Sequence, residues 1–360
     1  MAIDGGLASL SESLWTAATG TYMLAVVAYT GEYAFGKNGR IAQTSAAQTS
    51  ATQTRAVQAA VQASAVQANA RQPALVGAGE ATPDQPGPLD QPRSGAGPVE
   101  PAGDAGRRWG RAAVGLTVLA AVFHLASVAI RGIAVDRVPW GNMYEFTLVV
   151  GLMATVAWLA TLVKMPQLRY LGLFVMMPVL LVMFLAGTLY TKASKLVPAL
   201  QSYWLAIHVS SVAVAEGILL TSAAITGMYL VRARFERHAA AGTAPARFAG
   251  LGSRLPAAAS LDKAAYRTVA FAFPIYTAGV IFGAIWAEAA WGRYWGWDPK
   301  ETWAFIAWVV YATYLHARAT AGWKGNRAAY INLLGFGAMT FNFFVVNIVI
   351  SGLHSYAGLS

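Results

Sequence analysis

A tryptophan-rich run with charged neighbours, WGRYWGWDPKETW at residues 291–303, contains the residue types best suited to hold a ligand. Tryptophan gathers at membrane–water interfaces, which accounts for one or two such residues at a boundary. Here Trp291, Trp295 and Trp297 follow one another closely and Asp298 comes directly after them. The intervening glycines have no side chain and let backbone or a planar ligand approach closely. The run therefore favours a ligand platform over an aromatic belt.

Two of the five histidines are predicted to lie at the same depth as this run. His208 lies about five residues, or roughly 8 Å, inside one end of an apolar segment, and His354 lies just past the end of another. Either histidine alone is better explained by a structural hydrogen bond than by ligation. Ionisable residues in membrane spans are nonetheless functional candidates. Two imidazoles and an aromatic platform at one depth predict a bis-histidine site for haem, which needs two axial nitrogens and flat apolar walls.

The remaining histidines fit that site less well. His316 lies about 14 residues, or some 21 Å, into its segment, and His124 differs from it in depth by about 8 to 10 Å. One haem bridging these two would be strained, so a haem ligand at His316 would need a partner from another polypeptide. For His124 a packing role is favoured slightly over ligation. His238, in a basic connection, is interpreted as a solvated loop residue.

The elements that must position these residues are membrane spans. Hydrophobic residues make up 56% of the 360 residues and charged residues 12%, and a spanning helix needs about 20 mainly apolar residues. We expect an all-α, polytopic helical membrane protein with about eight transmembrane helices. Their approximate limits are 14–36, 110–131, 143–163, 169–190, 203–231, 266–288, 302–320 and 329–352.

Three regions follow from these spans. Residues 1–36 form the first span, 37–108 a low-complexity linker rich in Ala and Gln and then in Pro and Gly, and 109–360 a seven-span core whose tryptophan-rich loop is residues 291–303. The composition of the linker predicts a largely disordered segment.

The basic residues predict the orientation. The linker and the connections after spans three, five and seven carry 20 of the 26 Lys and Arg residues. Because cytoplasmic loops are enriched in Lys and Arg, the linker is predicted to be cytoplasmic, and both termini and the tryptophan-rich loop to face outside. The net charge of +10 is thereby explained by topology, and no nucleic-acid partner is expected. The absence of cysteine excludes disulfides, zinc–thiolate sites and a catalytic thiol.

Four motifs, in order, carry a resemblance to a known family: VPWGNMYEFTL, YWLAIHVSS, WGRYWGWDPKETWAF and SGLHSYA. Together they resemble the CcsA (ResC-type) cytochrome c biogenesis proteins of System II, whose tryptophan-rich signature is called the WWD motif. The similarity covers spans two to eight. The long insertion between the first two spans departs from the family pattern without affecting any of the motifs.

The resemblance implies a haem lyase (synthase) component in the cytoplasmic (inner) membrane. Such proteins bring haem b to the outer face and, with a CcsB/ResB-type partner, attach it to apocytochrome c at Cys-x-x-Cys-His; thiol-reducing proteins are further expected partners. His208 and His354 match the axial ligands and are the catalytic candidates. The other matching positions are the haem-holding Trp291, Trp295, Trp297 and Asp298, and the intramembrane ligand His316, whose counterpart lies in the partner subunit.

Two alternatives stay open: a haem-delivery or export protein without ligase activity, and a b-type electron-transfer cytochrome. Arg293, Lys192 and Lys195 are candidate partners of the haem propionates, although each also suits ordinary topology. Glu216 is an intramembrane carboxylate with no assigned role beyond lining something polar.

Overall fold

The structure, a computed structural model, describes residues 4–35, 102–194, 196, 200–243, 249–320 and 322–354, together with positions 54, 55, 58, 61 and 62. Within these residues the secondary structure is helical and contains no strand. Most of the predicted linker lies outside the described residues. The named elements are α1 (Gly5–Phe35), α3 (Ala102–Ala134), α4 (Met143–Lys164), the 3-10 helix η1 (Pro166–Leu171), α5 (Gly172–Thr188), α6 (Tyr203–Ala240), α7 (Ala249–Gly252), α8 (Ala258–Trp291), α9 (Pro299–Ala319) and α10 (Asn326–Ile348).

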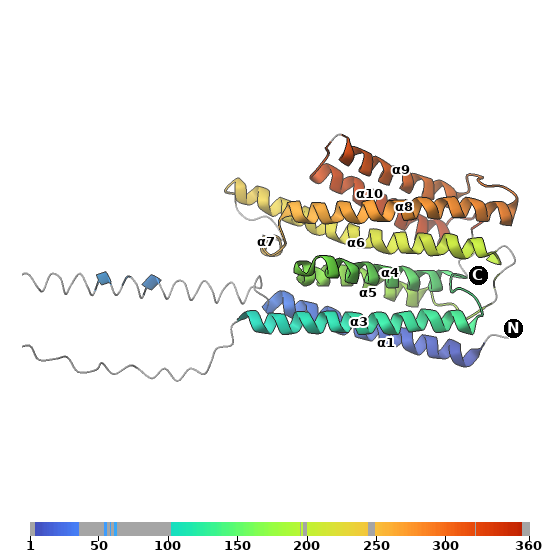
Figure 1. The fold of residues 1–360 in the computed structure, drawn as a ribbon, viewed down its shortest axis with the longest axis horizontal. Coiled ribbons are helices and arrows are strands. Elements are labelled where there is room, and N and C mark those ends of the chain that lie inside the picture. Colours follow the sequence, from blue (N-terminus) through green and yellow to red (C-terminus); the bar gives the residue numbers. More distant parts are fainter. Residues whose placement is uncertain are drawn as a thin grey trace, which may run out of the picture.

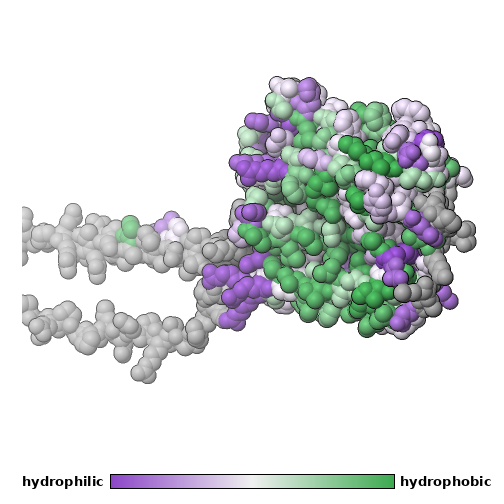
Figure 2. All heavy atoms as spheres, turned by 45° about the vertical axis from the view of Figure 1, so that its right-hand side comes forward, coloured by the Kyte–Doolittle hydropathy of each residue, from purple (hydrophilic) through white to green (hydrophobic). Residues whose placement is uncertain are grey.

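The long helices make this a multi-pass membrane protein. Six stretches of the described chain are long and apolar enough to cross a bilayer: Gly106–Ala134, Met143–Lys164, Leu168–Thr188, Tyr203–Ala240, Ala258–Trp291 and Asn326–Ile348. The two remaining predicted spans correspond to α1 and α9, which are not among these six, so the predicted count of eight is not confirmed. Figure 2 shows an apolar surface between two polar ends, as expected for a chain whose solvent is lipid.

The helices pack side by side, with α1 against α3, α6 against α8 and α9 against α10, while α4 contacts α6 and α5. In Figure 1 the start of α1, the end of α10 and the connections α3–α4, α5–α6 and α8–α9 all lie at one end of the bundle. This is the alternation that the sequence predicts. We call this end the motif end, because all four sequence motifs reach it.

Helix caps define the motif end. Asn142 caps α4 and Ser202 caps α6, each accepting a hydrogen bond from a backbone N–H of the first turn. Gly292 ends α8 with a φ of 69°, a conformation that glycine adopts without steric cost. Asp298 then caps α9. The loop that carries the tryptophans is therefore held between a helix stop and a helix start.

Candidate functional site

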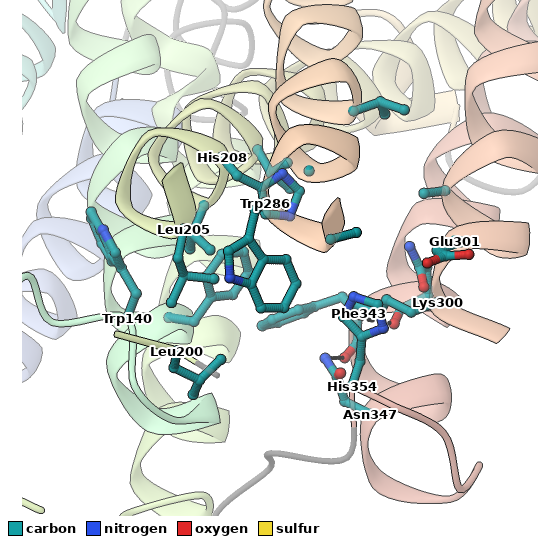
Figure 3. A pocket seen from close by; sticks show the side chains of 18 of the residues that line it. Trp140, Leu200, Leu205, His208, Trp286, Lys300, Glu301, Phe343, Asn347 and His354 are labelled. Atoms are coloured by element: carbon teal, nitrogen blue, oxygen red, sulfur yellow. Dashed lines mark hydrogen bonds between the residues drawn. The ribbon is translucent and has the colours of Figure 1, made fainter. Parts of the chain in front are cut away.

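A cavity opens at the motif end between α4, α6, α8, α9 and α10. Its volume is about 1170 Å³ including the open mouth. Its walls carry aromatic side chains and a small set of polar groups, as Figure 3 shows. The lining residues that bear on the chemistry are Trp140, His208, Glu216, Trp286, Trp295, Lys300, Glu301 and His354.

His208 enters this cavity from α6 with one ring nitrogen already engaged. Its Nδ1 lies 2.7 Å from the carbonyl oxygen of Gly279 on α8. A carbonyl only accepts, so Nδ1 carries the hydrogen and Nε2 of the neutral ring keeps its lone pair. Gly283 makes room for the ring, because a Cβ there would lie 2.7 Å from the Cε1 atom of His208. The sequence thus builds an oriented imidazole that can bind a metal through Nε2.

His354, just after α10, is oriented in the same way by a carboxylate. Its Nδ1 lies 2.8 Å from Oδ2 of Asp298. Burial lowers the pKa of His354 and outweighs the opposing effect of Asp298, so the ring is neutral at pH 7. Burial alone would raise the pKa of Asp298, but hydrogen bonds from the Leu353 N–H, from His354 and from the Lys300 N–H hold it below its usual value. An imidazole that donates Nδ1–H to a carboxylate is the usual arrangement behind a metal-binding Nε2.

Asp298 connects three segments of the motif end. Its Oδ1 accepts from the Leu353 N–H at 2.8 Å, and its Oδ2 accepts from the Lys300 N–H at 3.3 Å. Glu301 completes a capping box by accepting from the Asp298 N–H at 3.1 Å and from the Gly296 N–H at 2.8 Å. From the sequence, Asp298 is predicted to hold haem. In the structure Asp298 contacts His354, which is a predicted ligand of the haem iron.

The three predicted platform tryptophans point in different directions. Trp295 lines the cavity. Trp291 packs against His354, with ring centroids 4.9 Å apart. Trp297 is 66% exposed and has a φ of 58°, which is uncommon for a bulky residue. The structure therefore places only Trp295 of these three on the cavity wall.

The aromatic residue that contacts both histidines is Trp286, which is not among the residues predicted from the sequence. Its ring is stacked on His208 at 6.2 Å with an interplanar angle of 7°, and it meets His354 edge-on at 5.6 Å. Figure 3 shows the indole between the two imidazoles. The available signal was a tryptophan five positions before Trp291 in an otherwise small-residue and aliphatic stretch.

The other singled-out residues lie in different surroundings. His316 is exposed on α9, away from the cavity. His124 is fully buried, with Nδ1 3.3 Å from the Tyr22 hydroxyl, as the favoured packing role requires. Of the suggested propionate partners, Arg293 lies 3.5 Å from Glu301, Lys192 is exposed and Lys195 falls outside the described residues. Glu216 lines the cavity.

These features define a multi-pass helical membrane protein that turns two oriented imidazoles towards one aromatic cavity. The family model "Cytochrome C assembly protein" matches residues 140–354, from one cavity-lining residue, Trp140, to another, His354. The chain belongs to this family and is a CcsA-type cytochrome c biogenesis protein, which confirms the resemblance inferred from the sequence motifs.

Several curated relatives carry the name cytochrome c biogenesis protein CcsA. That of Guillardia theta is 37% identical over 264 residues, covering 68% of this chain and 85% of the relative. That of Synechococcus elongatus is 39% identical over 199 residues, covering 46% of this chain and 61% of the relative. That of Chlamydomonas reinhardtii is 40% identical over 165 residues, covering 46% and 44% respectively.

Proposed function

We propose that this chain is the haem-handling subunit of a cytochrome c synthase and presents haem b at the outer face of the cytoplasmic membrane. The observation that carries the proposal is the matched orientation of His208 and His354. In each ring Nδ1–H donates a hydrogen bond to a protein oxygen, and both residues line the same cavity. Two nitrogens suit a metal whose four equatorial ligands come from a porphyrin.

The reaction is the addition of two acceptor thiols across the two vinyl groups of the haem. In each addition the S–H bond breaks, sulfur bonds to one vinyl carbon and hydrogen is added to the other. The chain contains no cysteine, so both thiols belong to the Cys-x-x-Cys-His segment of apocytochrome c, which thiol-reducing proteins keep reduced. The contribution of this chain is to position the haem. Good positioning alone can lower a barrier by about 7 to 11 kcal/mol.

A CcsB/ResB-type membrane partner is part of this proposal. The α9 helix is less apolar than the six candidate spans. It nevertheless has an exposed face, which carries Phe305, Ile306, Val309 and His316. An exposed histidine within the membrane is costly unless something covers it. We place the partner on this face, where it would supply the second ligand for a haem at His316 on its way across the membrane.

Coexpression with a CcsB/ResB-type partner and an apocytochrome c reporter tests the synthase function. Covalent haem on the reporter is scored after denaturation, and the control reporter has both acceptor cysteines replaced by serine. We expect covalent haem on the intact reporter alone, and only when this chain and its partner are both present. Haem on this chain without covalent haem on the reporter would favour delivery or export. Rapid reversible reduction of that haem by a quinol would favour a b-type cytochrome.

A further inference from the structure

The inner end of the cavity carries a cation and a carboxylate that the proposed ligation does not use. Lys300 is the one Lys or Arg side chain among the described residues that line the cavity, and Glu216 lines it as well. Both side chains are partly buried, and they interact electrostatically with each other. Opposite charges in such a place indicate a site for a charged ligand group.

Glu216 lies deeper than His208, and the Lys300 ammonium lies deeper than His354. Glu216 follows His208 by two turns of α6, or about 12 Å along the helix. The Lys300 ammonium donates to the backbone oxygen of Asn342 at 3.1 Å. Asn342 lies before the end of α10, whereas His354 lies beyond that end. The cavity therefore has a charged floor, while Trp140, Leu200 and Trp295 belong to its apolar walls.

The chemistry of the floor matches one edge of haem. The hydrogen bond to Asn342 uses one of the three donors of the Lys300 ammonium. A carboxylate ligand would supply a charge-assisted partner, which is stronger than a neutral carbonyl. Haem carries two propionates on one edge and two vinyl groups elsewhere on the ring. Glu216 interacts electrostatically with Lys300 and would therefore compete with a propionate for it.

We propose that Lys300 binds a haem propionate and thereby directs the propionate edge to the floor and the vinyl edge to the mouth. This inference rests on the proposed haem-handling function and deepens it. It gives the cavity a means of presenting the vinyl carbons to thiols that arrive from outside. Arg293, by contrast, is occupied by Glu301 and lies outside the cavity lining.

Binding of haem and of its dimethyl ester to the purified full chain in detergent tests the proposal. The ester keeps the iron and the vinyl groups but has no charged propionate. We expect the wild type to prefer haem by about tenfold or more, the range of a charge-assisted hydrogen bond. Lys300→Met should abolish the preference, because it should weaken the binding of haem but not that of the ester. Lys300→Arg should keep part of the preference. Glu216→Gln should increase it. Lys164→Met, at the exposed end of α4 opposite the motif end, is the matched control and should change nothing.

Equal wild-type affinity for haem and its ester would overturn the proposal without any variant. Equal weakening of both ligands by Lys300→Met would also overturn it, because that pattern indicates a structural role. In either case a haem spectrum that depends on His208 would leave the proposed function standing. If neither ligand gives a spectrum that depends on His208, the proposed haem site itself is wrong.

Discussion

Oδ2 of Asp298 accepts the Nδ1–H of His354 at 2.8 Å, and the same carboxylate caps α9. The aspartate of the tryptophan-rich motif thus acts on the imidazole and on the start of a helix. Since the capping box also holds Gly296, Asp298 and Glu301 together fix the loop, the start of α9 and His354. This explains why an acidic pair follows the tryptophans.

Replacing Asp298 by asparagine should weaken haem binding. Both carboxylate oxygens of Asp298 accept backbone or imidazole N–H groups, whereas an amide offers one acceptor oxygen and turns an N–H towards the other donor. Loss of such a partner behind a metal ligand lowers affinity by about 10- to 100-fold. Titration of the purified protein with haem measures the change, with Asp262→Asn at the other end of the bundle as the control. Unchanged affinity would show that the carboxylate does not orient His354.

A methyl group at position 217 should separate two walls of the cavity. A Cβ on Gly217 would lie 2.5 Å from the backbone nitrogen of Ala154, so Gly217→Ala must push α6 away from α4. Gly227 lies on the same helix, and a Cβ there would have no neighbouring atom within 4 Å. We expect Gly217→Ala to lower both thermal stability and haem affinity. Gly227→Ala should be neutral or stabilising by about 0.5–1 kcal/mol. Equal melting temperatures of the two variants would contradict the close approach.

Glu145 should be essential for the stability of the α3–α4 connection. Its buried carboxylate accepts from Arg131 at 3.1 Å, from Arg137 at 2.7 Å and from the Gly141 N–H at 2.8 Å. Glu145→Gln leaves two guanidinium groups short of a counter-charge, which typically costs about 3–5 kcal/mol. Glu12, 3.8 Å from Arg131 and partly exposed, is the control, since such pairs contribute about 0–1 kcal/mol. Thermal unfolding in detergent compares Glu145→Gln with Glu12→Gln, and similar effects would contradict the assignment.

The His316→Ala variant should have a phenotype that depends on the partner subunit. In the isolated chain His316 is exposed on α9, so the substitution should leave haem content unchanged. In the complex with a CcsB/ResB-type partner the same substitution should remove one haem. Haem is quantified per chain with and without the partner. Haem content that depends on neither His316 nor the partner would rule out a shared site.

The sequence predicted that His208 and His354 lie at the same end of the bundle, because alternating spans force particular loops to the same end. His208 and His354 are far apart in the chain, yet each lies near an end of a span that topology assigns to one side. The all-α class followed from composition, because apolar segments of this length are predicted to be spanning helices. The sequence also predicted α1 and α9 as spans, which the structure does not confirm, because Thr, Tyr and Trp residues lower the apolar character of both helices.

The details of the site depend on geometry that spacing does not encode. Trp286 contacts both histidines because of the way α8 is rotated about its own axis. The spacing of residues along one sequence does not determine that rotation. Gly292 and Trp297 adopt positive φ values that turn the loop. As a result Trp295 lines the cavity, whereas Trp291 and Trp297 do not. Of the propionate candidates suggested by topology, Lys192 is exposed and Arg293 is paired with Glu301, whereas Lys300 is the one Lys or Arg that lines the cavity among the described residues.

The absorbance spectrum of purified His208→Ala and His354→Ala variants tests the central claim most directly. His238→Ala, which replaces a histidine at the opposite end of α6, is the control. We predict that each of the first two variants loses haem and its six-coordinate spectrum, that added imidazole restores both, and that His238→Ala matches the wild type. Wild-type haem content and spectrum in both His208→Ala and His354→Ala would contradict the account.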